Sequence, residues 1–234
     1  MYGKSKVLVD KGFTNSGDII FEGNHTATYG DASTYKTRRS IDLGGFAGWV
    51  LETLQWTSSG YPTWKGNIVN TGAIKHIGKT TSGVRVGGIF AILEGSAPTI
   101  TDGSFINTGD IVCTGEYSSN AAPFGVGGIA GVTFKGISNG KAFCNVNAIN
   151  YPTAGMITGS PRSSDNVVSN CQLGGTITLS SQGVENGDGD MIYTPIIETI
   201  DESNFFDYIY GGETAWQDEW NYDGCSVLEV KPTI

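Results

Sequence analysis

Two short segments contain residue types at the spacing of known phosphate-binding or catalytic motifs. Residues 73–80 approximate a phosphate-binding loop (Ala-Ile-Lys-His-Ile-Gly-Lys-Thr), and residues 136–140 match a nucleophile elbow (Gly-Ile-Ser-Asn-Gly). Both motifs require a helix directly after them, because its N-terminal amides hold the phosphate or its start presents the serine. The residues after Thr80 predict a strand, and no histidine follows Ser138 to act as a base. We therefore expect neither segment to perform this chemistry.

A third segment, residues 186–190 (Asn-Gly-Asp-Gly-Asp), resembles the beginning of a calcium-binding loop. Met191 replaces the glycine that the sharp turn of such a loop needs, and Ile197 replaces the glutamate at its twelfth position. An acidic surface loop fits these residues better, with weak calcium binding as the alternative. The four cysteines lack the C-x-x-C spacing of a structural zinc site. We expect no metal and no cofactor.

Enzymes that cleave polysaccharides need carboxylates, or a carboxylate beside Arg or Lys, gathered on one face. The charged residues of this chain are scattered instead. Asp18 and Asp110 occupy equivalent positions of a repeat, but Ala73 lies between them in the series, and Arg38 and Arg39 lie in a polar connection. Because no acidic or basic residues are predicted to stack, we expect the chain not to be an enzyme.

Aromatic residues provide the best candidates for ligand binding. We predict a ligand-binding set in and just before an insertion at residues 50–66: Trp49, Trp56, Tyr61 and Trp64. Their rings are large, apolar and flat, so they suit the apolar faces of sugars, and inserted loops of repeat proteins often form the binding face. The alternative interpretation is that these rings anchor the inserted loop to the flank of the fold.

Composition limits the classes of protein that remain. Of the 234 residues, 35 are glycine and only 16% are charged, which excludes a coiled coil or helix bundle. The net charge of −9 disfavours nucleic-acid binding, which requires a basic surface. No apolar run reaches the roughly 18 residues of a membrane span. Residues 1–6 lack the apolar stretch of a signal peptide, and we expect the chain to be part of a longer polypeptide.

Two phrases alternate along the chain. The first contains Asn-Thr-Gly or Asn-Ser-Gly in its clearest copies and occurs at residues 13–19, 68–74, 105–111 and 143–149, with a weaker copy at 170–176. The second has an apolar-Gly-Gly core and occurs at residues 43–48, 86–91 and 126–131, with a degenerate copy at 153–158. Apolar residues in each unit alternate with polar ones or form short runs rich in Val, Ile and Thr, which predicts short strands rather than helices.

One such unit cannot bury its own apolar face, whereas stacked units can, because each coil hydrogen-bonds to the coils above and below it. We therefore predict an all-β fold, a right-handed parallel β-helix (β-solenoid) over residues 1–182. The right hand follows from the general handedness of parallel crossovers. The units are expected near residues 13–42, 43–85, 86–125, 126–152 and 153–182, with insertions at 50–66 and 114–125.

Stacking brings equivalent residues of successive units into columns. One column holds the glycine of the first phrase, replaced by asparagine in the fourth copy: Gly17, Gly72, Gly109 and Asn147. Since asparagine tolerates positive φ best among the other residues, we expect a left-handed turn there. A second column holds asparagines whose amides are expected to form a hydrogen-bonded ladder: Asn15, Asn70, Asn107 and Asn145. The column before it ends in Cys144 and Cys171, which we expect to face inward as neighbouring buried thiols or as a disulfide.

The alternation of the two phrases resembles a known family. Gly45-Phe46-Ala47-Gly48 and Gly128-Ile129-Ala130-Gly131, each combined with an Asn-x-Gly phrase, resemble the GLUG-motif repeats of adhesin-like bacterial surface proteins. The resemblance covers roughly residues 10–180, although Ala91 replaces the closing glycine of the second unit and the fourth unit has lost most of the motif. It implies export, a cell-surface location and no chemistry in the repeats themselves.

Residues 183–234 break the repeat and are rich in aromatic and acidic residues. We expect them to cap the end of the solenoid within the same domain, because an open strand edge invites aggregation, with a glycan platform as the alternative. The whole sequence predicts a non-enzymatic extracellular module of an adhesin-like bacterial surface protein. It would act as a rigid spacer, or as a surface that binds a host or dietary glycan or a host surface protein. The alternative is a carbohydrate-active β-helix that binds or cleaves a polysaccharide.

Overall fold

The computed structural model of the chain describes residues 9–25, 40–51, 63–80, 83–94, 99–115, 125–134, 136–149, 151, 153–162, 167–180, 184–185, 191–192, 194–211 and 223–234. Regular structure in these residues consists of β-strands and one short helix, α1 (Phe205–Tyr208). The strand pairings that join successive repeats are parallel. The prediction of an all-β protein with parallel sheets is therefore confirmed.

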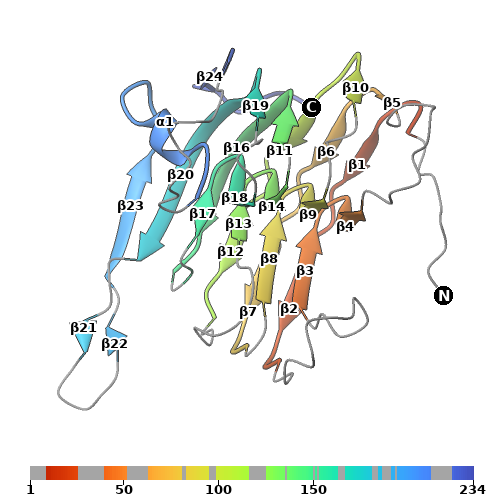
Figure 1. The fold of residues 1–234 in the computed structure, drawn as a ribbon. Helices are drawn as coiled ribbons and strands as arrows, with labels where there is room; N and C mark the ends of the chain where they lie inside the picture. Colours follow the sequence, from red (N-terminus) through yellow and green to blue (C-terminus); the bar gives the residue numbers. More distant parts are fainter. Residues whose placement is uncertain are drawn as a thin grey trace.

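Strands of successive repeats gather into three larger sheets (Figure 1). The first sheet contains the repeat strands β1 (Phe13–Asn15), β2 (Ile19–Glu22), β6 (Ile68–Asn70), β7 (Ile74–Ile77), β11 (Phe105–Asn107), β12 (Ile111–Cys113), β16 (Gly140–Asn147) and β20 (Gln172–Ser180). The second sheet contains β3 (Ser40–Gly44), β8 (Gly83–Gly87), β13 (Gly125–Gly127) and β17 (Ala154–Gly155). The third sheet contains β4 (Ala47–Leu51), β9 (Phe90–Glu94), β14 (Ala130–Thr133) and β18 (Thr158–Pro161).

Three smaller strand pairs lie outside the three larger sheets. Two are parallel: β5 (Thr63–Lys65) pairs with β10 (Thr99–Thr101), and β15 (Gly136–Ser138) pairs with β19 (Val167–Ser169). The third, β21 (Val184–Glu185) with β22 (Met191–Ile192), is antiparallel and projects from the body in Figure 1. Strand β5 lies within the predicted insertion at 50–66, so the end of that insertion is regular sheet structure.

The clearest copies of both phrases are stacked in register. In the first sheet Phe13 lies opposite Ile68, which lies opposite Phe105. In the second sheet Leu43, Val86 and Val126 stack in the same way. We call the strands that one repeat adds to the three sheets a rung. Each rung thus presents equivalent apolar side chains at equivalent places, which is the condition for a continuous core.

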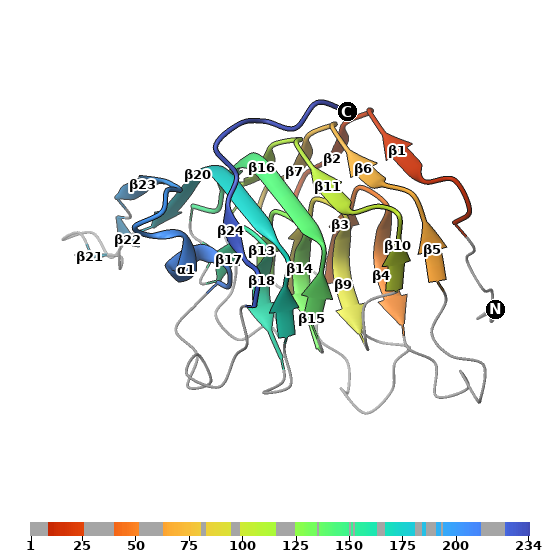
Figure 2. The ribbon, with the colours of Figure 1, turned by 90° about the horizontal axis from the view of Figure 1, so that it is seen from above.

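The core lies between the first sheet and the other two, and Figure 2 shows the first sheet along one side of the molecule and the third sheet across from it. It is built from the apolar positions of the two phrases and the strands between them. Its fully buried large side chains include Ile68, Ile74, Ile89, Phe90, Leu93, Phe105, Ile111, Ile129, Met156 and Ile157. Burial of these large apolar side chains is the main stabilisation of the stacked strands.

The asparagine ladder forms, but over three rungs only. The Nδ2 atom of Asn15 donates to Oδ1 of Asn70 over 2.7 Å, and Nδ2 of Asn70 donates to Oδ1 of Asn107 over 2.8 Å. Asn145 was expected as the fourth member, and that prediction is wrong because Ala142 lies opposite Asn107. Asn145 lies further along β16 and its Oδ1 accepts a hydrogen bond from Thr176.

The register of the fourth repeat therefore differs from the predicted one. Phe105 pairs with Gly140 rather than with Phe143, and Val126 of the second sheet pairs with Ala154 rather than with Thr153. In the fifth repeat Gln172 lies opposite Lys141. The segments at 143–149 and 170–176 resemble the first phrase in sequence. They do not lie in register with the copies of that phrase at 68–74 and 105–111.

The expected left-handed turn at the first-phrase glycines is also wrong. None of Gly17, Gly72, Gly109 and Asn147 is among the described residues with positive φ. Gly72 and Gly109 are needed for a different reason, which is the close approach of stacked backbones. A Cβ atom on Gly72 would lie 2.1 Å from the carbonyl oxygen of Gly17, and one on Gly109 would lie 2.0 Å from that of Gly72.

The C-terminal tail covers the last rung. Strand β23 (Pro195–Thr199) pairs antiparallel with one part of β20, and β24 (Ser226–Val227) pairs parallel with another part. Between them, Phe205, Ile209 and Tyr210 are buried in the core, and the amide of Ile157 donates to the carbonyl of Ile209. Figures 1 and 2 show the last residues running from β24 across the outer side of the first sheet, toward β6.

The structure also bears on membrane insertion. Within the described ranges, no helix has the length and apolar character needed to cross a bilayer.

Candidate functional site

The four predicted ligand-binding aromatics do not form one exposed surface. Trp56 and Tyr61 lie outside the described residues. Trp49 is half-buried in β4. Trp64 lies in β5 with only 3% of its surface exposed, so its ring is not available to stack on a sugar.

Trp64 belongs to an aromatic cluster at the first rungs. Its ring centroid lies 5.1 Å from that of Phe46 and 6.4 Å from those of Phe90 and Phe105. The rings of Phe90 and Phe105 lie 5.3 Å apart at a steep angle, which is a favourable edge-to-face arrangement. This cluster joins the third sheet, the first sheet and β5, and its role is to hold the core together.

An acidic and a basic side chain do stack, contrary to the expectation from sequence. Asp42 in β3 lies in register with Arg85 in β8. The Nε atom of Arg85 donates to Oδ1 of Asp42 over 2.6 Å, and its Nη2 donates to Oδ2 over 3.1 Å. The arginine is 3% exposed and the aspartate 20%. This bidentate pair with a buried guanidinium fixes two strands together.

A signal for this pair was present in the sequence. Asp42 and Arg85 each stand directly before a copy of the second phrase, at equivalent positions of adjacent repeats. The acidic residues of the first phrase have a comparable structural task. Oδ1 of Asp18 accepts from the amide of Ala73, and Oδ1 of Asp110 accepts from the amide of Asn145. Both carboxylates thus bind the backbone of a neighbouring rung.

A buried histidine, His76, lies in β7 of the first sheet. Nδ1 of His76 lies 2.7 Å from the hydroxyl oxygen of Tyr151, and Phe21 stacks on the imidazole with centroids 5.7 Å apart. The Nε2 atom has no hydrogen-bond partner. Burial lowers the pKa of His76, and the neighbouring His25 lowers it further. The imidazole is therefore neutral near pH 7, and Cys113 lies opposite it in the next rung.

The cysteines are arranged differently from the prediction. All four are free thiols in the structure, and Cys144 lies opposite Gly175 rather than beside Cys171. Burial raises the pKa of Cys113, and it raises the pKa of Cys144 to about 12. Cys171 instead lies beside Cys225 of the C-terminal tail, because Gln172 pairs with Ser226 and the amide of Ser226 donates to the carbonyl oxygen of Cys171. Sequence spacing alone gave no sign of this contact, because the two residues belong to segments with no shared motif.

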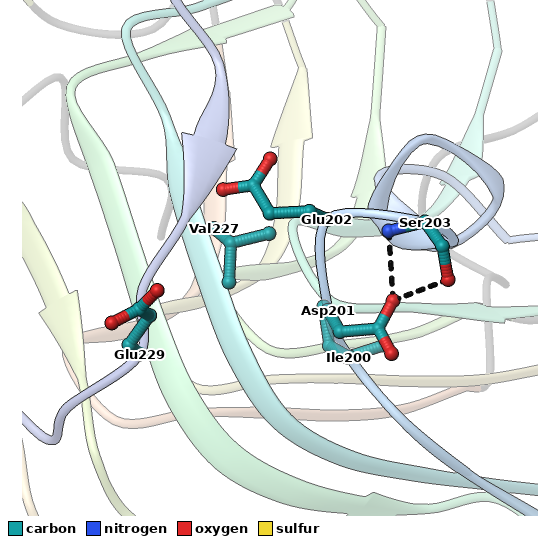
Figure 3. Close-up of a pocket in the computed structure, with 6 residues that line it drawn as sticks. All are labelled: Ile200, Asp201, Glu202, Ser203, Val227 and Glu229. Atoms are coloured by element: carbon teal, nitrogen blue, oxygen red, sulfur yellow. Dashed lines mark hydrogen bonds between the residues drawn. The ribbon is translucent and has the colours of Figure 1, made fainter.

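A shallow acidic hollow lies where the tail meets the last rung (Figure 3). It has a volume of about 340 Å³, and its lining residues are Ile200, Asp201, Glu202, Ser203, Val227 and Glu229. The amide and hydroxyl of Ser203 donate to Oδ1 of Asp201 over 2.8 and 2.6 Å, and these bonds lower the pKa of that carboxyl. Across the described ranges, no three His, Cys, Asp or Glu residues are grouped so that they could hold a metal ion.

Two of the three motif-like segments lie within the described residues, and both are part of the strand structure. The segment at 73–80 is followed by strand β8, as expected. Ser138 ends strand β15, and its Oγ lies 2.8 Å from that of Ser169 in the neighbouring strand. The calcium-like residues 186–190 lie outside the described residues.

Comparisons with known proteins assign no family to the chain. No family model matches it, and neither a curated protein nor a solved structure gives a significant match.

Proposed function

We propose that this chain is a right-handed parallel β-solenoid that acts as a rigid spacer in an adhesin-like bacterial surface protein, outside the cell. One observation carries the proposal: successive repeats pair in register and in parallel in all three larger sheets. Such stacking gives stiffness and length along one direction, because each rung contacts only its neighbours. The resemblance to GLUG-motif repeats adds the cell-surface setting and the bacterial source.

Three features support a spacer over a catalyst or a glycan platform. Trp64 is part of the core. Arg85 and Asp42 satisfy each other across two strands, and the carboxylates of Asp18 and Asp110 accept backbone hydrogen bonds. The polar groups that were the best candidates for chemistry are therefore engaged in holding the rungs in place.

A pulling experiment tests the spacer directly. The chain is held by its two ends in an optical trap and stretched. A rigid spacer keeps a nearly constant end-to-end distance until it unfolds cooperatively and releases a contour of about 800 Å. Gradual extension at low force, like that of a flexible linker, would contradict the proposal.

A binding screen separates the spacer from the other candidates. The purified chain is applied to arrays of glycans and of host matrix proteins, and polysaccharides are incubated with it and sized. A spacer is retained on neither array and leaves the polysaccharides intact. Specific retention would favour a ligand-binding module, and shortening of a polysaccharide would favour a carbohydrate-active enzyme.

A further inference from the structure

Two cysteines meet where the C-terminal tail joins the last rung, and they point to a covalent site beyond the proposed function. Cys171 stands directly before β20, and Cys225 stands directly before β24. We propose that these two residues form a disulfide bond when the protein meets an oxidising thiol–disulfide environment. The bond fastens the tail to the body of the fold.

The strand register places the two residues side by side. Gln172 lies opposite Ser226 in a parallel pair, and the amide of Ser226 donates to the carbonyl oxygen of Cys171 over 3.0 Å. Neighbouring strands are about 4.8 Å apart, and in-register residues of parallel strands point to the same face. That separation lies within the roughly 4.4–6.8 Å between Cα atoms that a disulfide requires. The two thiols are also near enough for each to shift the pKa of the other.

The surroundings of the two sulfur atoms suit opposite roles in exchange. Cys171 is fully buried, and its Sγ accepts the amide of Gly140 over 3.2 Å. Cys225 is only half-buried, so a small disulfide can reach it. The neighbouring Cys171 lowers the pKa of Cys225, while Cys225 and burial raise the pKa of Cys171. Cys225 is therefore the attacking thiolate and Cys171 the resolving thiol.

The reaction with a low-molecular-weight disulfide balances in two steps. The Cys225 thiolate attacks one sulfur of oxidised glutathione, which breaks the glutathione disulfide and releases one glutathione thiolate. The Cys171 thiol then loses its proton to solvent, and its sulfur attacks the Cys225 sulfur and releases the second glutathione thiolate. Two protein thiols are oxidised and one glutathione disulfide is reduced to two thiols.

The other two cysteines provide an internal comparison. Cys113 and Cys144 are buried, and the residues opposite them in the neighbouring strands are His76 and Gly175 rather than cysteines. Because burial raises the pKa of both thiols, they react slowly with a disulfide reagent. Selective loss of two thiols out of four is therefore the signature of the proposed site.

Peptide mapping of the full chain tests the pairing. The folded protein is incubated with oxidised glutathione, blocked with an alkylating reagent, and digested without reductant for mass spectrometry. The expected products are an intact chain lighter by two hydrogen atoms and a linked peptide pair containing Cys171 and Cys225. Four free thiols, a stable glutathione adduct on Cys225, or a link to Cys144 would each overturn the proposal.

Two variants and a melting experiment test the role of the bond. Cys225→Ser is expected to lose the linkage, and Cys144→Ser to keep it. In the wild-type chain the oxidised form should melt about 5–10 °C above the reduced form, because the bond closes a long loop, and dithiothreitol should reverse the shift. Equal melting temperatures of the two forms would show that the bond does not fasten the tail. If a variant fails to fold, the wild-type peptide map alone decides the pairing.

Discussion

The side chain of Asn70 makes hydrogen bonds in three directions. Its Oδ1 accepts from Asn15, and its Nδ2 donates to Asn107 and to the carbonyl oxygen of Gly72. Asn15 and Asn107 bond in the same way to the carbonyl two residues further on. The Asn-x-Gly spacing of the first phrase thus has a structural role. The ladder amides hydrogen-bond both to the carbonyl of the glycine in their own turn and to the asparagine of a neighbouring rung.

Replacing Asn70 with alanine is expected to destabilise the protein by about 2–4 kcal/mol, because a buried amide is lost and both ladder neighbours lose a partner. Urea unfolding followed by circular dichroism measures the change. The matched control is Asn145→Ala, at a residue that is exposed and outside the ladder, which should cost less than about 1 kcal/mol. Equal costs for the two substitutions would show that the ladder contributes little.

His76 gives the stability a pH dependence. Its pKa is lowered in the folded protein from the ordinary value of 6.5, so at pH values between the two the unfolded chain binds more protons. The free energy of unfolding therefore falls as the pH is lowered through 6.5, by at most about 1.4 kcal/mol per pH unit for one group. Above pH 6.5 the contribution of His76 to the free energy of unfolding is fully present, and it is lost as the pH falls below that value.

A His76→Phe variant isolates this contribution. The phenyl ring fills a similar space but does not titrate, so the variant should lose less stability than the wild-type chain between about pH 7.5 and about pH 5.5. Urea midpoints at the two pH values give the comparison. If both proteins lose stability equally, groups other than His76 dominate the acid dependence.

At the scale of the strand and its turn, the glycines of the second phrase pack directly on the first phrase. A Cβ atom on Gly45 would lie 2.7 Å from Cγ of Asn70, and one on Gly88 would lie 2.3 Å from Cγ of Asn107. The two phrases alternate because the asparagine of one rung occupies the space that the glycine of the preceding repeat leaves free.

Gly88→Ala should therefore destabilise the protein by at least about 2 kcal/mol, since its Cβ would also meet the carbonyl oxygen of Gly128 at 2.2 Å. Thermal and urea unfolding measure the loss. Gly17→Ala is the matched control, because its Cβ would have only one neighbour, at 3.8 Å, and its cost should stay within about 1 kcal/mol. A tolerated Gly88→Ala would mean that the stacked backbones can separate without penalty.

Strand register is predictable from the sequence in the clear repeats and not in the degenerate ones. Where a repeat keeps its phrase, as at Asn15, Asn70 and Asn107, stacking and register follow from the spelling. In the fourth rung Ala142 replaces the ladder asparagine, so a nearby Asn145 with similar neighbours gives a false alignment. The sequence also does not show why a glycine is needed. Close contact between backbones and a positive φ both favour glycine, so the residue type alone does not distinguish them.

The candidate site was less predictable than the fold. An aromatic residue in an insertion has the same composition signal whether it faces solvent or the core, and Trp64 is in the core because β5 pairs with β10. The contact between Cys171 and Cys225 depends on where a non-repeating tail returns to the sheet. Such long-range contacts have no local sequence signal, whereas Asp42 and Arg85 had one in their shared position before the second phrase.

At the scale of the whole molecule, the two ends of the stack differ. Strands β1 to β4 of the first rung each pair on one side only among the described residues. The last rung is covered, since β20 pairs with β23 and β24 and Thr158 forms a bridge with Tyr210. The tail thus closes one edge, which would otherwise be a template for pairing with another chain.

Deleting residues 223–234 is expected to reopen part of that edge. The deletion removes β24 and the bond from the amide of Leu228 to Leu173, so the melting temperature should fall by about 5 °C or more and the chain should self-associate. Light scattering over a range of concentrations measures the association, with reductant present so that no disulfide contributes. Deleting only residues 230–234 is the control: Val230 and Ile234 are 73% and 59% exposed, and the shorter deletion should leave a monomer of nearly unchanged stability. Monomers from both deletions would show that β24 is not what protects the edge of β20.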